Sequence, residues 1–345
     1  MKNLLVFLSA CTFLLLSGCS SRASRLPNSG NNVDSHLRSN CFPALGFQPP
    51  LSTPPDSALD TWWCDPADEH AFMGFSYEVT ACQSPAQLIR EFLDIRDHFH
   101  GRYVRLLQLS DDIVDAAWIS GLGVHALIWF GFDGDDIWIG RRDTLLAALH
   151  ANPRAKFITR VLQFGSEPLF DNVLPVNQLT AQVEMAKANL SSLGIPVTVS
   201  ELAFGYQERA GSQALLDALD SINIHMLPFF SQQASIANDS WPIVLNDLDW
   251  FIDHGNGKKM YFDENGWPSV TSEGVQPNSP LAVADIQNEH DYYVLLDQHC
   301  EDLKAVVGGG IGWFAHIYSD DQEPGYGIYN EWGSLKFPFH PRTSC

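Results

Sequence analysis

The sequence predicts a single (β/α)8 barrel that follows a short N-terminal extension. Eight short runs rich in β-branched and aromatic residues alternate with helical patterns from residue 71 onward. Several runs are apolar throughout, as expected of parallel strands covered on both faces. The stretch 71–345 has a usual length for one such barrel. A doubly wound sheet is the alternative, but no glycine-rich phosphate loop follows a predicted strand.

Composition restricts the class of partner. The 345 residues include 20 Lys and Arg against 41 Asp and Glu, for a formal net charge of −21. Nucleic acid and anionic membranes are therefore excluded as main partners, because phosphate groups need clustered cations.

Hydrophobic residues make up 45% of the chain and aromatic residues 12%, enough for a large core. An acidic, aromatic-rich chain suits an extracellular protein that meets a neutral polymer.

The first 19 residues have the pattern of an export signal. Lys2 supplies the positive charge, and Leu4–Leu16 is an uncharged run too short to span a membrane. We expect it to be cleaved, which leaves no transmembrane segment in the mature chain and a secreted product, with the cell wall as one destination. Leu16–Cys19 also matches a bacterial lipobox, so Cys19 would carry a lipid anchor only in a bacterial source.

Residues 20–70 are interpreted as a linker, because residues 20–57 are rich in Ser, Pro and Asn. The catalytic domain is assigned to 71–345.

Export favours disulfides. We expect Cys300–Cys345 to tie down the C-terminus and Cys41–Cys64 to form a second bridge, which leaves Cys82 unpaired. No cysteine pair has CxxC spacing, so no metal site is predicted.

Two helix boundaries are marked in the sequence. Ser84, Pro85 and Gln87 form a capping-box pattern at the start of the first helix, and Gly194 ends a later helix. The eight predicted strands are, in order, Phe72–Tyr77, Tyr103–Leu109, Val124–Phe130, Phe157–Ser166, Pro196–Glu201, Ile222–Leu227, Lys259–Glu264 and Gly310–Ile317.

Carboxylates mark the ends of the fourth and seventh strands: Glu167 follows the fourth and Glu264 ends the seventh. Active sites of such barrels lie at the C-terminal strand ends, where strands four and seven face each other. Paired carboxylates suit cleavage of a glycosidic bond, since one must be protonated and the other ionised.

Several motifs resemble those of glycoside hydrolase family 17, the β-1,3-glucanases. The string FDENGWPS at 262–269 resembles the family's nucleophile motif, and Gly165–Glu167 its acid/base motif. Weaker likenesses occur at Gly74–Tyr77, Val104–Leu106 and Leu227–Phe230. The fungal branch is the most similar. The resemblance implies a retaining mechanism with Glu167 as acid/base and Glu264 as nucleophile, and no cofactor.

The chain departs from the family pattern in two places. Ser166 replaces an Asn that in related barrels contacts the sugar 2-hydroxyl. The eighth strand, Trp313–Asp321, lacks the usual Lys, although Glu323 fits a later family segment. Substrate contacts at Ser166 and Glu323 are therefore expected but altered.

Aromatic rings at strand ends suit stacking on sugars, and core packing is the alternative for each. Arg105 is expected either to orient a carboxylate or to form a structural ion pair inside the barrel. We expect the strand histidines His125, His225 and His316 to be core residues or to support the site rather than to catalyse. The candidate platforms are Tyr77, Phe229, Phe230, Trp267 and Trp313.

The sequence thus predicts a secreted glycosidase, an endo-β-1,3-glucosidase in type, that hydrolyses or transglycosylates β-1,3-glucan of cell walls. Two alternatives remain open: a wall-associated glucan-binding protein with little turnover, and a barrel glycosidase for another β-glycan. Hydrolysis versus transfer, endo versus exo action and the oligomeric state are not decided by these patterns.

Overall fold

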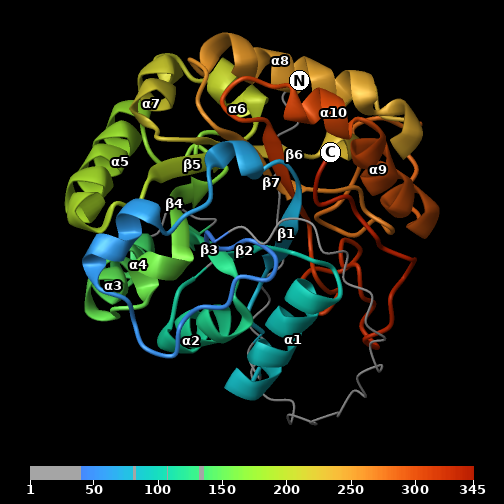
Figure 1. The fold of residues 1–345 in the computed structure, drawn as a ribbon. Coiled ribbons are helices and arrows are strands. Elements are labelled where there is room, and N and C mark those ends of the chain that lie inside the picture. Colours follow the sequence, from blue (N-terminus) through green and yellow to red (C-terminus); the bar gives the residue numbers. More distant parts are fainter. Residues whose placement is uncertain (1–39, 81–82, 107, 132–135) are drawn as a thin grey trace.

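The computed structural model describes residues 40–80, 83–106, 108–131 and 136–345. Its sheet is a closed barrel in which β1 to β8 follow one another in sequence order. Every neighbouring pair is parallel, including β8 with β1. The helices form a ring around these strands (Figure 1). The predicted (β/α)8 barrel is therefore confirmed.

All eight strands occur at the predicted places, although the third and eighth end two residues earlier than predicted, at Ile128 and Ala315. The fourth differs at its start, because residues 157 and 158 belong to the short helix α4 instead of the strand. The strands are β1 Ala71–Tyr77, β2 Tyr103–Leu106, β3 Gly123–Ile128, β4 Thr159–Ser166, β5 Val197–Glu201, β6 Ile222–Met226, β7 Met260–Asn265 and β8 Ile311–Ala315.

Helices connect the strands, as the right-handed parallel crossover requires. The α-helices of the described residues are α1 Pro85–Asp97, α2 Asp111–Ser120, α3 Ile137–Ala151, α4 Ala155–Ile158, α5 Val176–Leu190, α6 Ala203–Glu208, α7 Ser212–Ala218, α8 Trp241–His254, α9 Ile286–Gln298 and α10 Cys300–Lys304. Short 3-10 helices are η1 Asp56–Thr61, η2 Pro66–Asp68, η3 Ser191–Leu193, η4 Pro228–Phe230 and η5 Ala237–Asp239.

Both boundary signals mark helix ends, the first of them only in part. The Ser84 hydroxyl accepts a hydrogen bond from the Gln87 backbone amide and caps α1. The Gln87 side chain instead donates to Glu91, so only half of the capping box forms. Gly194 follows η3 with a φ of 66°, a left-handed conformation that glycine adopts without steric cost.

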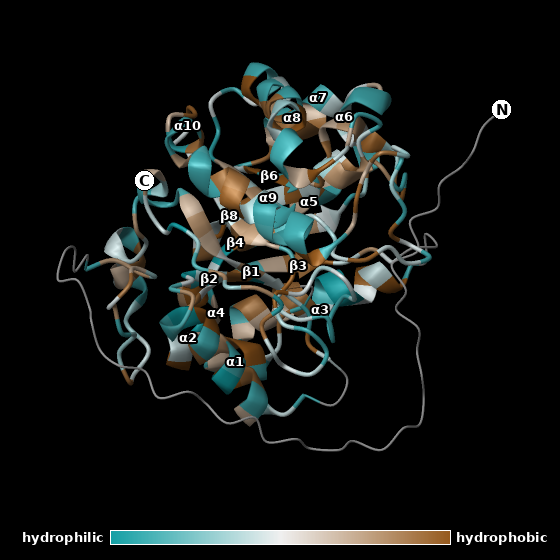
Figure 2. Ribbon diagram, turned by 90° about the vertical axis from the view of Figure 1, so that its right-hand side faces the viewer, coloured by the Kyte–Doolittle hydropathy of each residue, from teal (hydrophilic) through white to brown (hydrophobic). Residues whose placement is uncertain are grey.

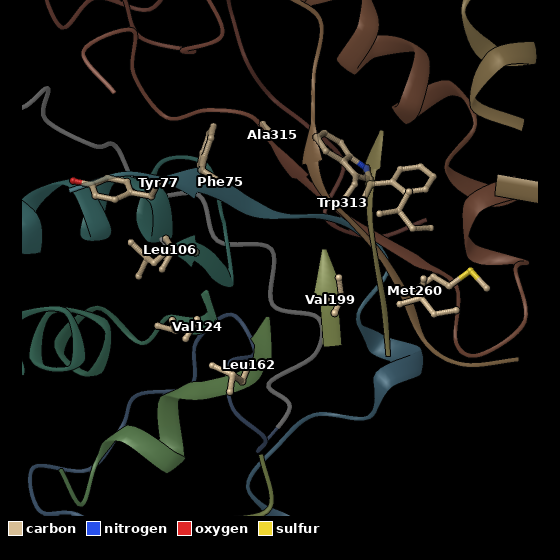
Figure 3. Close-up of a cluster of buried hydrophobic side chains, with 14 of the residues drawn as sticks. Phe75, Tyr77, Leu106, Val124, Leu162, Val199, Met260, Trp313 and Ala315 are labelled. Atoms are coloured by element: carbon tan, nitrogen blue, oxygen red, sulfur yellow. The ribbon is translucent and has the colours of Figure 1, made fainter. Parts of the chain in front are cut away.

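Apolar strand side chains form the core between barrel and helices. Figure 3 shows such side chains on strands all around the barrel, among them Leu106 of β2, Leu162 of β4 and Trp313 of β8. A smaller cluster of buried side chains fills the barrel interior and supports the side chains nearer the barrel mouth. Its members are Met73, Tyr103, Tyr261 and Phe314. In Figure 2 the central strands are largely hydrophobic, while hydrophilic residues cover much of the outer helix surface.

Residues 40–70 are packed structure, which corrects their assignment to a linker. Phe42 and Trp62 belong to the main core, and Trp62 donates a hydrogen bond to the Phe157 carbonyl. Glu69 is fully buried at the N-terminal end of the barrel, where it accepts from Tyr103 and pairs with Arg160 at 2.9 Å. The segment therefore closes the barrel end opposite the expected active site.

Both predicted disulfides are present. Cys41–Cys64 fixes the N-terminal segment and Cys300–Cys345 fixes the C-terminus. The predicted export signal, Cys19, the linker before residue 40 and Cys82 lie outside the described residues. None of the helices within the described ranges is both long and apolar enough to cross a bilayer.

Candidate active site

The chain turns sharply where β4 ends, and this turn presents Glu167. Gly165 has a φ of 99°, and a Cβ there would lie within 2.8 Å of the Phe130 ring. Glu167 itself has a φ of 51°, and its amide donates to the Ser200 carbonyl of β5 at 2.8 Å. Residues other than glycine rarely adopt a positive φ, so the backbone conformation of Glu167 costs free energy locally. This conformation sets the direction of the Glu167 carboxylate.

The residues after Glu264 hold the end of β7 in place. Asn265 accepts a hydrogen bond from the Tyr292 hydroxyl at 2.6 Å and donates to the Phe314 carbonyl of β8. The next residue, Gly266, passes so close to β8 that a Cβ would lie 2.9 Å from the His316 carbonyl oxygen. Asn265 and Gly266, which follow Glu264 in the motif, thus each have a structural role.

Arg105 and Ser166 bind the Glu264 side of the site. The Arg105 Nη1 atom lies 2.8 Å from Glu264 Oε2, and its Nη2 donates to the Ser166 hydroxyl at 3.0 Å. Ser166 Oγ also lies 3.4 Å from Glu264 Oε2. Arg105 is 3% exposed, so this charge-assisted contact is largely shielded from water. Of the two roles weighed for Arg105, orientation of a catalytic carboxylate is the one that the contacts support.

His225 of β6 lies between the two glutamates. Its Nδ1 is 2.7 Å from Glu167 Oε1, and its Nε2 is 3.2 Å from Glu264 Oε2. The β6–β7 register shifts at this point, so that His225 is paired with Glu264.

A second histidine, His316, lies directly after β8 and faces Glu264. His316 Nε2 is 2.9 Å from Glu323 Oε2 and 3.9 Å from Glu264 Oε1. Burial opposes charge on this ring, but Glu323 and Glu264 outweigh it and raise the pKa of His316. Glu323 therefore reaches the site through His316 and lines the cleft.

These neighbours set the charge states of the centre. Burial alone would raise the pKa of Glu264, but His225, Arg105 and His316 hold it well below its usual range. Burial likewise opposes charge on His225, yet Glu264 and the hydrogen bond to Glu167 raise its pKa to about 9. Glu264 is consequently ionised at neutral pH, as a nucleophile must be.

A buried polar layer supports the two glutamates from below. Asp263 Oδ2 accepts hydrogen bonds from Ser200 at 2.7 Å, from Asn223 at 3.2 Å and from the Gln163 amide. One carboxylate thereby links four neighbouring strands. Sequence reasoning missed this layer, although the polar residues on otherwise apolar strands were a usable signal.

Glu201 at the end of β5 fixes the loop after Glu167. Its carboxylate accepts from the backbone amides of Leu169 at 2.6 Å and Phe170 at 3.1 Å. Complete burial and the nearby Glu167 raise the pKa of Glu201 to about 8. Glu201 was not among the predicted site residues, although its position at the end of the predicted fifth strand was a usable signal.

A cleft of about 1850 Å³ opens above these residues. Its lining includes Glu167 and Glu264 and extends to loops of strands all around the barrel mouth. The aromatic residues that line it are Tyr77, Trp129, Phe170, Phe204, Phe230 and Tyr326. Within the described ranges, no three His, Cys, Asp or Glu side chains are grouped as metal ligands.

A family model, the BtgE/BtgC glycoside hydrolase domain, matches residues 74–333. The chain belongs to this glycoside hydrolase family. The matched range contains both glutamates and all eight strands except the first three residues of β1. The finding agrees with the resemblance to family 17 that the motifs indicate. No curated protein matches the sequence.

Solved structures share the fold of this BtgE/BtgC domain at low sequence identity. An active-site mutant of Rhizomucor miehei β-1,3-glucanosyltransferase, in complex with laminaritriose, is similar with a TM-score of 0.63 and 17% identity, over 78% of this chain and 97% of that chain. A β-1,3-glucanase and allergen of Cryptomeria japonica pollen is similar with a TM-score of 0.52 and 13% identity, over 77% and 98%. A β-D-glucuronidase from Dictyoglomus thermophilum is similar with a TM-score of 0.56 and 12% identity, over 78% and 49%.

The BtgE/BtgC domain brings most of the predicted site residues together. Glu167, Glu264, Arg105, Ser166 and Glu323 all line the one cleft. Two predicted aromatic residues, Tyr77 and Phe230, line it as well. Tyr77 is only 1% exposed, and its hydroxyl is bonded to Glu91 and Gln83.

Three predicted sugar platforms are core residues instead. Phe229, Trp267 and Trp313 are at most 1% exposed. The Phe229 and Trp267 rings pack 5.3 Å apart, and Trp313 stacks on Tyr293 at 5.8 Å. A ring without an exposed face offers no stacking surface to a sugar, so these residues support the fold and are not substrate contacts.

The three strand histidines separate into two groups. His125 is buried among aromatic rings in the barrel interior, where burial and nearby Arg160 hold its pKa well below the usual value. His225 and His316 instead contact the glutamates directly.

Proposed function

We propose that the protein is a secreted retaining glycosidase that cleaves β-1,3-glucan through a glycosyl-enzyme intermediate. The observation that carries the proposal is the placement of Glu167 and Glu264 on either side of one imidazole ring, inside a large open cleft. Two carboxylates in different electrostatic surroundings are what glycoside cleavage needs.

The surroundings suggest the roles. Glu264 faces Arg105, His225 and His316, whose positive charges keep it ionised for attack on the anomeric carbon. Glu167 has no arginine or lysine contact among the described residues and faces His225. It is therefore the acid that protonates the departing glycosidic oxygen, and then the base that activates the incoming hydroxyl.

The cleft suits an extended neutral glycan. Its lining combines apolar rings with amide, hydroxyl and carboxylate groups, as carbohydrate recognition requires. A cleft of about 1850 Å³ has room for several sugar units, which favours endo action. The similar R. miehei and C. japonica structures are named for β-1,3-glucan chemistry, and this supports the choice of linkage.

Hydrolysis and transfer share the first step and differ in the acceptor that attacks the intermediate. Water gives a hydrolase, here an endo-β-1,3-glucosidase, while a sugar hydroxyl gives a glucanosyltransferase. Both remain within the proposal. Two disulfides, the acidic charge and the leader-like first 19 residues support export to the cell wall or medium.

Incubation of the purified protein with laminari-oligosaccharides labelled at the reducing end tests the proposal. We expect shorter products, and NMR should detect their β anomer first. Products longer than the substrate should appear if transfer competes. An α anomer formed first would refute retention. Tight binding without turnover would favour the glucan-binding alternative, and cleavage only of mannan or β-1,4-glucan would favour another β-glycan.

A further inference from the structure

His225 lies between the two glutamates, a position that core packing or the support of a single carboxylate does not explain. The side chain is 2% exposed, and each ring nitrogen faces a different catalytic carboxylate. The Ser166 hydroxyl lies 3.3 Å from Nε2, on the Glu264 side of the ring. The two nitrogens of an imidazole belong to one rigid ring. A movement of either glutamate that shifts the ring therefore also changes the contact with the other glutamate.

We propose that His225 is a positioning residue that shares the acid's proton with Glu167 while it donates a hydrogen bond to Glu264. The inference rests on the proposed function, in which Glu167 is the acid/base and Glu264 the nucleophile. It adds a third member to that pair.

The proton count is the same in both forms of the site. Nε2–H donates to Glu264 throughout. One further proton lies either on Glu167, with Nδ1 accepting, or on Nδ1, with Glu167 ionised. At 2.7 Å the proton moves between these atoms without another donor. When the proton moves from Glu167 to Nδ1 of His225, it therefore stays inside the site and can return to the acid.

The reaction steps balance with this proton. Glu264 forms a bond to the anomeric carbon as the glycosidic C–O bond breaks, and the proton passes through Glu167 to the leaving oxygen. In the second step Glu167 takes a proton from water or an acceptor hydroxyl. The resulting oxygen nucleophile displaces Glu264, which leaves as a carboxylate, and the shared proton is restored.

Charged groups at the ends of neighbouring strands act on His225 or on Glu264, which it contacts. The carboxylates outnumber the cations, and they outweigh burial to raise its pKa to about 9. The groups are Arg105 on β2, Glu167 and Asp171 after β4, Glu201 on β5, Asp263 and Glu264 on β7, and His316 at the end of β8. The shared proton is therefore retained well above neutral pH.

The pH profile of kcat/KM for wild type and His225→Gln tests the proposal. Glutamine keeps a polar side chain at this position but cannot bind the proton. We expect the alkaline limb of the variant to move to lower pH by about one unit or more, because Glu167 alone must hold the proton beside ionised Glu264. An alkaline limb at the wild-type pH would overturn the proposal.

Two controls separate other causes. His290→Gln, the same substitution on a histidine bonded to Asp291 outside the site, should keep the wild-type limb. Burial and Glu167 raise the pKa of Asp171 to about 7, so this cleft residue also titrates nearby. Asp171→Asn should shift the limb far less than His225→Gln, and an equal shift would assign the limb to Asp171 and refute the proposal.

An NMR titration of the imidazole signals gives a readout that needs no turnover and no variant at position 225. In Glu167→Gln the charge opposite Nδ1 is lost, so the His225 midpoint should fall by about one unit or more from its wild-type value. An unchanged midpoint would overturn proton sharing even in an active glycosidase. If no β-glucan is cleaved, the proposed function fails, while this titration still decides whether the proton is shared.

Discussion

The Arg105 guanidinium forms a 2.8 Å ion pair with Glu264, the proposed nucleophile, while it donates a hydrogen bond to Ser166. Its Nε also donates to the Gln163 side chain at 3.2 Å. One buried cation thus fixes three groups on the floor of the cleft. A lysine keeps the charge but has no planar fork, so it cannot replace these contacts together.

Arg105→Lys should therefore lower kcat/KM by roughly 10- to 100-fold, the loss of one charge-assisted hydrogen bond of about 1.5–3 kcal/mol. Steady-state kinetics on a laminari-oligosaccharide measure this effect. Arg142→Lys, on an exposed pair with Asp143, is the matched control and should retain wild-type kinetics. Full activity in Arg105→Lys would show that the charge alone is sufficient.

Ser166 is already engaged by three partners, which makes the larger Asn a poor fit. Its hydroxyl lies within 3.4 Å of Arg105, His225 and Glu264. Ser166→Asn should consequently lower kcat, because the added atoms displace at least one partner from its position. Ser166→Ala, which adds no volume, should reduce kcat less. A higher kcat for Ser166→Asn would show that the natural serine leaves a sugar contact unmade.

Loss of the acid and loss of the nucleophile should be separable by leaving group. Glu264→Gln should abolish cleavage of every substrate. Glu167→Ala should retain cleavage of an aryl glycoside whose leaving group needs no protonation, and added azide should then give a β-glycosyl azide. Product NMR identifies the azide. Equal loss of activity on activated and natural substrates in Glu167→Ala would refute the assigned roles.

Core and cleft aromatic residues should respond differently to truncation. Trp313→Phe removes part of a buried ring that packs on Phe72 and Tyr293, so it should lower stability by roughly 1–3 kcal/mol without raising KM. Phe204, which lines the cleft and is 54% exposed, is the contrasting position. Phe204→Ala should raise KM and leave the unfolding midpoint nearly unchanged. Thermal unfolding and kinetics on the same samples distinguish the two effects.

The sequence was sufficient for the elements whose pattern is local. Apolar runs such as Ile311–Ala315 predict buried parallel strands, and the letters around Glu264 mark one candidate catalytic carboxylate. Features set by register were harder to predict. His225 meets both glutamates because the β6–β7 register shifts between Ile224 and His225, and hydrophobic periodicity contains no sign of that shift.

Side-chain direction at strand ends was the main source of error. Trp267 follows β7 and Trp313 lies within β8, and at both positions a ring can point either into the cleft or into the core; both rings point into the core. The segment from 40 to 70 was misjudged because its Pro- and Ser-rich composition hides two anchors. Phe42 and Trp62 join the core, and the Cys41–Cys64 bridge fixes the segment around them.

Covalent trapping of the nucleophile tests the central claim most directly. A 2-deoxy-2-fluoro laminaribioside with a good leaving group slows breakdown of the intermediate more than its formation, so the adduct accumulates. We expect intact-mass spectrometry to show a gain of one laminaribiosyl unit, and peptide mapping to place it on Glu264. Glu264→Gln should show no gain. An adduct on another residue, or none in an enzyme that cleaves the unfluorinated substrate, would contradict the account.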